Sequence, residues 1–219
     1  MSNLPRASIV VFLFLFLFFG LVVVGWGDLT GFLAHPARIG LVLVTILLTI
    51  PTLLAGANVS AGQREDVQNR WIFLPLSLVT LAFAYLPPYA DRHDLFTVDG
   101  DGVRYLGLTL YILGGGLRTW AIWTLGRRFS GLVAIQKNHH LETHGVYAII
   151  RHPSYLGAIL AMTGWTLVFR SLLVLVLVPI LIWIVIARIQ AEERLLAAQF
   201  GQAYADYRRR TWKLLPLVY

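Results

Sequence analysis

The stretch "PSYLGAILAMTGWTLVFRSLLVLVLVPILIWIVIA", residues 153–187, decides the fold of this chain. It contains 35 residues and one charged side chain, Arg170, which is followed by Ser171. A single helix of that length would extend about 50 Å at about 1.5 Å per residue, whereas the hydrocarbon core of a bilayer is about 30 Å thick. The stretch therefore predicts a helical hairpin that turns at Arg170 and Ser171. Each arm is slightly short for a full span, so tilt and incomplete insertion both stay open.

The rest of the chain is apolar in the same way. Its 219 residues are 58% hydrophobic and 13% charged, with a mean hydropathy of +0.70, which is more apolar than soluble domains are. Four further apolar segments lie at residues 8–26, 37–57, 71–90 and 103–125, separated by short polar loops. The first has no small-residue cleavage motif after it and is expected to be a retained anchor. The sequence predicts an all-α, polytopic membrane protein with about six apolar helical segments.

The basic residues predict the orientation in the membrane. Six segments place both termini on one side, together with the loops at 58–70 and 126–151. Of the 18 Lys and Arg residues, 13 lie on that side and four on the other, so the positive-inside rule makes the first side cytosolic. The net charge is +7, and the basic residues that give rise to it lie beside apolar runs. This position favours membrane lipids over nucleic acid as partners.

The C-terminal segment has a different pattern. Apolar residues recur at helical spacing over about 187–208, which predicts an amphipathic helix after the hairpin, with Tyr and Trp beside Arg as in interfacial helices. The face comprises Ile189, Leu196, Phe200, Ala203, Tyr204 and Tyr207. We accordingly divide the chain into N-terminal transmembrane helices, residues 1–125, and a C-terminal region, residues 126–219, that contains the polar loop, the hairpin and this helix.

Glycines and histidines could suggest other kinds of site. "GGG" at 114–116 lacks the spacing and the strand of a dinucleotide-binding loop, so no Rossmann domain is expected. These glycines, with Gly157 and Gly164, instead favour close helix packing. Four histidines lie between residues 139 and 152, but no second His-rich segment completes a metal-ligand set, so no metal is expected. The simplest alternative to a metal site is that these histidines lie in a hydrated loop at the membrane interface.

Arg188 and Glu192 lie four residues apart where the last apolar run reaches the cytosolic interface. They are either an exposed i,i+4 pair of small effect or a functional pair. Charges at this depth in a membrane are costly and are often functional, which favours the second interpretation.

Three elements in order resemble a known family. "HHLETHGVYAIIRHPSYLG" at 139–157, "RIQAEERLL" at 188–196 and the ending "FGQAYADYRRRTWKLLP" at 200–216 are similar to integral-membrane methyltransferases. That family includes isoprenylcysteine carboxyl methyltransferases and, more distantly, phospholipid methyltransferases. The resemblance covers about 80 residues, and the first hundred residues match only as generic membrane spans.

The resemblance implies that S-adenosylmethionine is the cofactor, and it implies roles for particular residues. Arg188 would face and bind the methyl acceptor, and Glu192 would close the cofactor pocket, so these two are the candidate catalytic residues. Glu142 stands where the family has an aliphatic residue, so its contact is expected through the backbone. The implied cofactor-binding residues are Gln136, His139, His140, Leu141, Glu142, Tyr147, His152, Pro153, Ser154, Tyr155 and Glu192.

The chemistry of these residues agrees with the resemblance. Tyrosine rings can stack on adenine or face a sulfonium cation, and a carboxylate can accept hydrogen bonds from a ribose or an ammonium group. The implied reaction is methyl transfer to a lipophilic acceptor from the bilayer, foremost the carboxylate of an isoprenylcysteine. A phospholipid amine and a small hydrophobic acid or thiol stay open as acceptors. A sterol-type reductase using a nicotinamide cofactor and a non-enzymatic transporter or scaffold are the rival classes. The short loops suggest a prokaryotic inner membrane with the active site on the cytosolic face.

Overall fold

A computed structural model describes residues 4–56, 58, 62–136 and 140–217 of the chain. Within these residues helices dominate, and a two-residue antiparallel pair of strands is the whole of the sheet structure. This confirms the all-α prediction. The helices are α1 (Leu4–Trp26), α2 (Leu29–Leu33), α3 (Pro36–Leu54), α4 (Phe73–Arg92), α5 (Asp101–Leu125), α6 (Pro153–Val168), α7 (Val174–Phe200) and α8 (Gln202–Arg209). Short 3-10 helices η1 (Val67–Ile72), η2 (Gly126–Arg128) and η3 (Gly145–Ala148) and the strands β1 (Arg64–Glu65) and β2 (Ala134–Ile135) complete the described elements.

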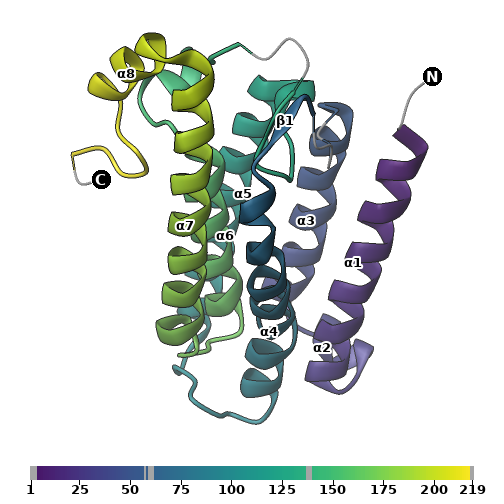
Figure 1. Cartoon of the computed structure of the whole chain (residues 1–219). Coiled ribbons are helices and arrows are strands. Elements are labelled where there is room, and N and C mark those ends of the chain that lie inside the picture. The colour runs from purple at the N-terminus through teal and green to yellow at the C-terminus, as the bar shows by residue number, and fades with distance from the viewer. Residues whose placement is uncertain (1–3, 57, 59–61, 137–139, 218–219) are drawn as a thin grey trace.

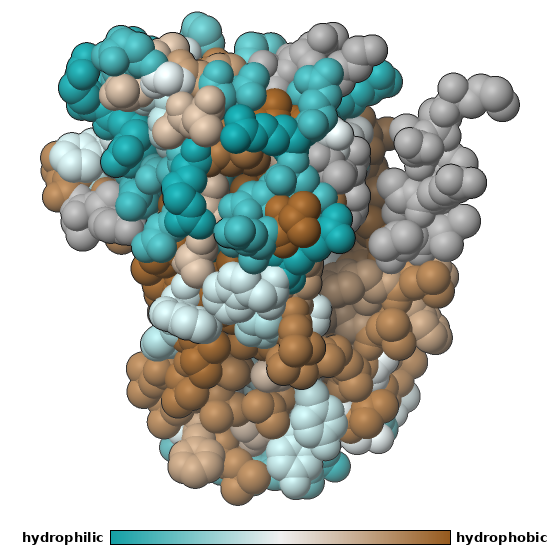
Figure 2. All heavy atoms as spheres, in the orientation of Figure 1, coloured by the Kyte–Doolittle hydropathy of each residue, from teal (hydrophilic) through white to brown (hydrophobic). Residues whose placement is uncertain are grey.

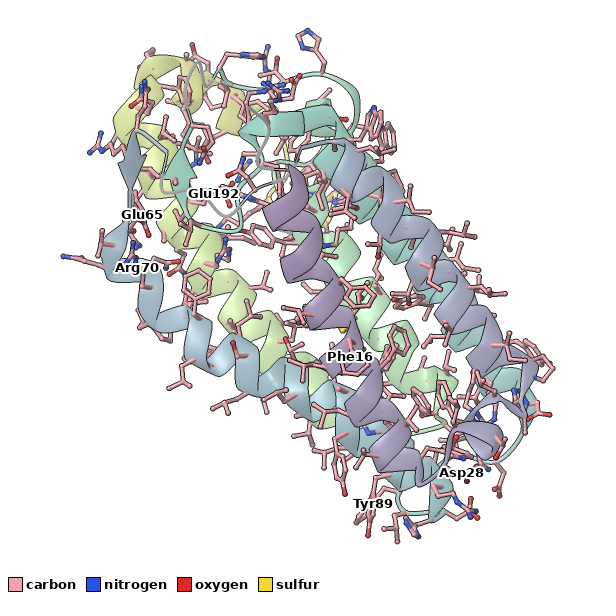
Figure 3. All side chains as sticks on the ribbon, turned by 90° about the vertical axis from the view of Figure 1, so that its right-hand side faces the viewer. Phe16, Asp28, Glu65, Arg70, Tyr89 and Glu192 are labelled. Atoms are coloured by element: carbon pink, nitrogen blue, oxygen red, sulfur yellow. The ribbon has the colours of Figure 1, made fainter. Side chains whose placement is uncertain are left out.

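The six long helices run alongside one another as a bundle with two different ends (Figure 1). We call residues 62–72, 126–152 and 188–217 the head end, and residues 27–38, 91–104 and 168–174 the far end. Helix α1 begins at the head end, and the chain also finishes there, which confirms that both terminal segments lie on one side (Figure 1). Figure 3 shows the same division, with Glu65 and Glu192 toward the head end and Asp28 and Tyr89 at the far end.

Apolar side chains cover the flank of the bundle, and hydrophilic ones gather at the head end (Figure 2). Among the described residues, the helices at Pro36–Leu54, Val67–Arg92 and Val174–Phe200 are long and apolar enough to cross a membrane, and Val11–Trp26 is a shorter apolar segment. Phe12, Phe16 and Leu74 are each more than half exposed on the flank. Because this much apolar surface is unfavourable in water, the protein is an integral membrane protein.

The predicted hairpin is present. Helices α6 and α7 are joined by residues 169–173, and Arg170 adopts a left-handed backbone with a φ of 51° at the turn. Helix α6 begins with Pro153 in its first turn, a position where the missing N–H of proline has no helical partner to lose.

The prediction of one continuous amphipathic helix over 187–208 was wrong. Helix α7 continues from the hairpin to Phe200, and the chain breaks at Gly201, whose φ of 53° is the left-handed conformation that glycine adopts without strain. Helix α8 then begins. Half of the predicted amphipathic face is buried, namely Ile189, Tyr204 and Tyr207, whereas Leu196 and Phe200 are partly buried and Ala203 is exposed.

Helices α5 and α6 approach each other closely along small residues, as predicted. A Cβ atom added at Gly164 would lie 2.4 Å from the carbonyl oxygen of Gly107, and one at Gly114 would lie 2.4 Å from the amide nitrogen of Ala161. A Cβ at Gly116 would meet nothing within 4 Å. Glycine is therefore required at the α5–α6 contact and not throughout "GGG".

This difference predicts that Gly164→Ala and Gly116→Ala have unequal effects. Gly164→Ala introduces a clash with backbone atoms and is expected to reduce the free energy of unfolding by about 1–3 kcal/mol, because overpacking forces the helices apart. Gly116→Ala is expected to be neutral or stabilising, because alanine has the higher helix propensity. Thermal unfolding of both variants in one detergent checks this, and equal unfolding temperatures would contradict it.

A buried charge cluster fastens the far end. Asp91, at the end of α4, has a fully buried side chain that accepts two hydrogen bonds from Arg104, at 2.6 and 2.9 Å, and one from Arg170 at 2.9 Å. Arg38 places a guanidinium nitrogen 3.6 Å from the same carboxylate and lies 3.9 Å above the ring of Trp26. One aspartate thus joins α3, α4, α5 and the hairpin turn.

Candidate active site

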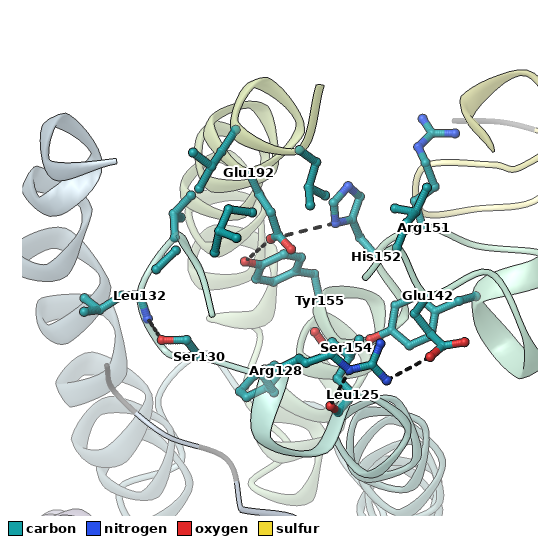
Figure 4. A pocket seen from close by; sticks show the side chains of 18 of the residues that line it. Leu125, Arg128, Ser130, Leu132, Glu142, Arg151, His152, Ser154, Tyr155 and Glu192 are labelled. Carbon is teal, nitrogen blue, oxygen red and sulfur yellow. Dashed lines mark hydrogen bonds and ion pairs between the residues drawn. The ribbon is translucent and has the colours of Figure 1, made fainter. Parts of the chain in front are cut away.

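A cavity with a mixed polar and apolar lining lies at the head end, between residues 125–135, residues 141–155 and the last turns of α7 (Figure 4). It contains about 790 Å³ of empty space, part of which is continuous with solvent. Its lining combines charged side chains, tyrosine hydroxyls and aliphatic groups. The lining residues are Leu125, Arg128, Phe129, Ser130, Leu132, Val133, Ala134, Ile135, Leu141, Glu142, Tyr147, Arg151, His152, Ser154, Tyr155, Glu192, Leu195, Leu196 and Tyr207.

Tyr155 connects the two residues that the sequence singled out on α7. Its hydroxyl donates a hydrogen bond of 2.9 Å to Oε2 of Glu192 and accepts one of 2.8 Å from Nε of Arg188. Arg188 also donates to the carbonyl oxygen of Gly131. Among the described residues, Arg188 and Glu192 make no direct ion pair within 4 Å, so the expected i,i+4 interaction is replaced by a relay through Tyr155.

The neighbouring carboxylate, Glu193, is engaged in a separate cluster. Its Oε1 accepts a hydrogen bond of 2.9 Å from Nε of Arg151 and lies 3.4 Å from Nε2 of His152. Its Oε2 lies 3.9 Å from the ammonium nitrogen of Lys213. His152 stands between the two glutamates, because its Nδ1 lies 4.0 Å from Oε2 of Glu192, as the dashed line in Figure 4 shows. Glu193 therefore supports the wall, whereas Glu192 lines the cavity.

The C-terminal tail holds this wall in place. The amide of Arg151 donates to the carbonyl oxygen of Trp212 at 2.8 Å, and the amide of Trp212 donates to Ile149 at 2.9 Å, so the two segments pair like short parallel strands. From α8, the buried hydroxyl of Tyr207 donates a hydrogen bond of 2.8 Å to the carbonyl oxygen of Tyr147. The C-terminal tail and residues 147–152 thus pack together as one unit, although they are about 60 residues apart in the sequence.

Glu142 and Arg128 form an ion pair at the opposite wall of the cavity. The guanidinium of Arg128 donates to Oε2 of Glu142 at 2.9 Å, and the amide of His144 donates to Oε1 at 3.2 Å. Partial burial opposes ionisation of the carboxyl group, but these hydrogen bonds outweigh it and lower the pKa of Glu142. Glu142 thus contributes its side chain, and not only its backbone, to the lining (Figure 4).

The structure brings together most of the residues predicted for cofactor binding. Leu141, Glu142, Tyr147, His152, Ser154, Tyr155 and Glu192 all line the cavity. Pro153 is buried in the first turn of α6 beside them.

Three predicted residues lie outside the cavity lining, and a fourth, His139, lies outside the described residues. The side chain of His140 is 70% exposed and its Nε2 contacts Arg128 at 2.6 Å, outside the lining. Gln136 is buried beside Gly62, and Arg188 lies behind Tyr155. Their roles stay predictions.

Sequence reasoning missed the third wall, which the residues 128–135 form. This segment contains no family motif, and its only signal was its place in the polar stretch after α5. Leu195 and Leu196 were also missed, although they lie three and four residues after Glu192 and so share its side of the helix. In the part of the chain that the structure describes, no three His, Asp or Glu side chains lie together as ligands for a metal ion.

Comparison with known proteins finds similarity over the C-terminal half of the chain. Residues 106–198 match the model of the isoprenylcysteine carboxyl methyltransferase (ICMT) family, which confirms the resemblance found in the motifs. Protein-S-isoprenylcysteine O-methyltransferase B of Arabidopsis thaliana is 38% identical over 119 residues, which are 53% of this chain and 60% of the relative. Protein-S-isoprenylcysteine O-methyltransferase of Tribolium castaneum is 38% identical over 116 residues, which are 52% of this chain and 41% of the relative.

A solved structure shares the fold. It is described as the eukaryotic intramembrane Ras methyltransferase ICMT without a monobody, and it aligns over 99% of this chain and 88% of its own, with a TM-score of 0.50 and 23% identity. This chain matches 60% or less of the length of the two relatives above. Both relatives come from eukaryotes, so the comparisons give no support to the expected prokaryotic setting.

Proposed function

We propose, from the match of residues 106–198 to the ICMT family model, that this protein methylates the carboxylate of a lipophilic, isoprenylcysteine-type acceptor with S-adenosylmethionine. The reaction would take place at the head end, on the cytosolic face of the membrane, within the region of residues 126–219. The observation that carries the proposal is the hydrogen-bonded series Arg188, Tyr155 and Glu192, which borders a cavity of mixed lining at the hydrophilic end of an apolar bundle.

The lining fits the chemistry of the cofactor. S-adenosylmethionine combines a flat adenine, a ribose diol, an amino-acid end and a sulfonium, and when bound it supplies an activated methyl group. Tyr147 and Tyr155 offer aromatic rings for adenine or for the cation. Glu192 can accept hydrogen bonds from a hydroxyl or an ammonium group, and Leu125, Leu195 and Leu196 offer apolar surface that would exclude water from an adenine. The predicted contacts of Gln136, His139, His140 and Pro153 belong to the same proposal.

We assign the binding of the acceptor to Arg188. Helix α7 runs from the far end to the head end, so Arg188 lies about 6 Å deeper along the helix than Glu192. An acceptor entering from the bilayer would therefore meet the guanidinium before the cavity. Arg188 as a whole residue is 8% exposed, and its guanidinium is already oriented by Tyr155 and Gly131, so it would hold a carboxylate through a charge-assisted hydrogen bond at little cost in entropy.

The charges favour a carboxylate over an amine as the acceptor. A carboxylate is already ionised and needs alignment and exclusion of water more than a base. An amine would need a carboxylate to orient it, and Glu193 is committed to Arg151, His152 and Lys213. Glu192 alone would have to serve both the cofactor and the amine. N-methylation of a phospholipid headgroup is therefore the second candidate.

Transfer of labelled methyl to a defined acceptor tests the proposal. Purified protein in lipid nanodiscs is incubated with methyl-labelled S-adenosylmethionine and a small S-prenylcysteine with a free carboxylate. We expect label in the acceptor that mild base releases as methanol, because the product is an ester. The matched control is the same compound as its carboxamide, which should stay unlabelled.

Arg188→Ala should lower turnover of the carboxylate at least tenfold while binding of S-adenosylhomocysteine persists. Base-stable label in a phospholipid amine would overturn the acceptor assignment. Failure of the wild type to bind S-adenosylhomocysteine, together with binding of a nicotinamide dinucleotide, would overturn the whole proposal.

A further inference from the structure

We infer that the head end carries a second site, which binds the phosphate of an anionic lipid beside the candidate active site. The site is an open depression between α8 and the C-terminal tail. Hydrophilic side chains gather over α8 in Figure 2. The depression is lined by Arg151, Ala205, Arg208, Arg209, Thr211, Trp212 and Lys213.

The charges of the lining leave a net positive field. Four of the seven lining residues are basic. Among the described residues, two carboxylates are paired with them: Glu193, with Arg151 at 2.9 Å and Lys213 at 3.9 Å, and Asp206, with Arg209 at 2.5 Å. Among the described residues no carboxylate lies within 4 Å of Arg208, and a lipid phosphate would supply the negative charge that this guanidinium lacks.

Arg208 is the centre of this excess. Its exposed side chain lines the depression, and its backbone carbonyl accepts a hydrogen bond from Arg151. The exposed side chain of Arg210 follows two residues later. One guanidinium group can donate two parallel hydrogen bonds to the oxygens of a phosphate. A cluster of guanidinium groups therefore suits a phosphate group better than it suits a single carboxylate.

Apolar side chains beside the depression indicate a lipid as the source of the phosphate. Trp212 lines the depression and is 42% exposed, and Leu215 and Leu217, three and five residues later in the tail, are 46% and 85% exposed. Tryptophan next to arginine is typical of the membrane–water interface, where the indole lies among the headgroups and leucines reach the acyl chains. A free phosphate would use the cations and leave this apolar group without a function.

The position of the site gives it a consequence for the neighbouring cavity. Arg151 lines both, and the tail residues Trp212 and Lys213 bond to the backbone of residues 149–152. A headgroup bound in the depression would hold the tail at the interface and so stabilise that wall. The inference does not depend on the identity of the methyl acceptor.

Native mass spectrometry of the full-length protein, released from detergent micelles, tests the site. The probes are phosphatidylglycerol, phosphatidylcholine and inorganic phosphate, each added alone. We expect phosphatidylglycerol to be retained at least fivefold more than phosphatidylcholine, and inorganic phosphate not to be retained. The double variant Arg208→Ala/Arg209→Ala should remove this preference. Arg64→Ala, which removes an exposed cation from β1 at the same end of the bundle, should keep it.

Each other outcome overturns the inference. Equal retention of the two lipids would show that the depression does not recognise a negative headgroup. Retention of inorganic phosphate without the lipid would show an anion site that is not a lipid site. An unchanged preference in the double variant would place the lipid elsewhere. Circular dichroism of the double variant must match the wild type, and Lys213→Ala, outside α8, provides a second test with the same expected loss.

Discussion

Tyr155→Phe is expected to lower methyl transfer about 100-fold. The substitution keeps the ring and removes only the hydroxyl that donates to Glu192 and accepts from Arg188. Both partners are charged, and hydrogen bonds to charged groups contribute about 1.5–3 kcal/mol each. Loss of alignment worth about 2.7 kcal/mol corresponds to about 100-fold in rate. The measurement is the initial rate with an S-prenylcysteine, alongside the affinity for S-adenosylhomocysteine.

The matched control for this substitution is Tyr204→Phe. Tyr204 is 1% exposed, and its buried hydroxyl has no hydrogen-bond partner among the described residues. Removing it should leave turnover within twofold of wild type and should not destabilise the fold. Equal rates for the two variants would contradict the role of Tyr155 as the link between Arg188 and Glu192.

Tyr155→Ala and Glu192→Ala, which remove cavity-lining groups altogether, are each expected to abolish binding of S-adenosylhomocysteine.

Asp91→Asn is expected to have the largest effect on stability. The change preserves shape but leaves Arg38, Arg104 and Arg170 around a neutral group in a site where the aspartate side chain is fully buried. Breaking a buried ion pair by removing one partner costs about 3–5 kcal/mol, because the remaining charges stay desolvated. For a chain of this size that corresponds to a fall of about 10 °C or more in Tm, measured by thermal unfolding in detergent.

Asp94→Asn serves as the control for the charge cluster. Asp94 also accepts a hydrogen bond from Arg170, at 2.7 Å, but its side chain is 75% exposed. Solvent already screens this pair, so the free energy of unfolding should change by less than about 1 kcal/mol. If Asp91→Asn unfolded at the same temperature as Asp94→Asn, the far-end cluster would not be what fastens the helices.

The sequence predicted the elements better than it predicted their ends. Long apolar runs and one charged break identified the α6–α7 hairpin and its turn at Arg170, because a bilayer limits the length of a span. The boundary between the hairpin and the amphipathic helix was misplaced. Helical periodicity continues through residues 187–208, and it does not reveal that the left-handed backbone of Gly201 ends α7.

The candidate site was likewise predicted only in part. The motifs identified Tyr147, His152, Ser154, Tyr155 and Glu192 as a group, and these residues do line one cavity. They did not identify the residues 128–135 as a wall, since nothing local marks that segment. Nor did they indicate that Glu192 and Glu193, which are adjacent in the sequence, have different partners.

By itself, the sequence determined that this protein is a helical membrane protein whose polar chemistry lies at one end. Hydrophobicity and its period are properties of residues along the chain, and they need no partner to be recognised. Only the tertiary structure decided how the charges are used: Tyr155 between Arg188 and Glu192, Glu193 with Arg151, and Asp91 among three arginines. Pairing depends on distances of about 3 Å between side chains from different helices, and those distances exist only once the bundle has packed.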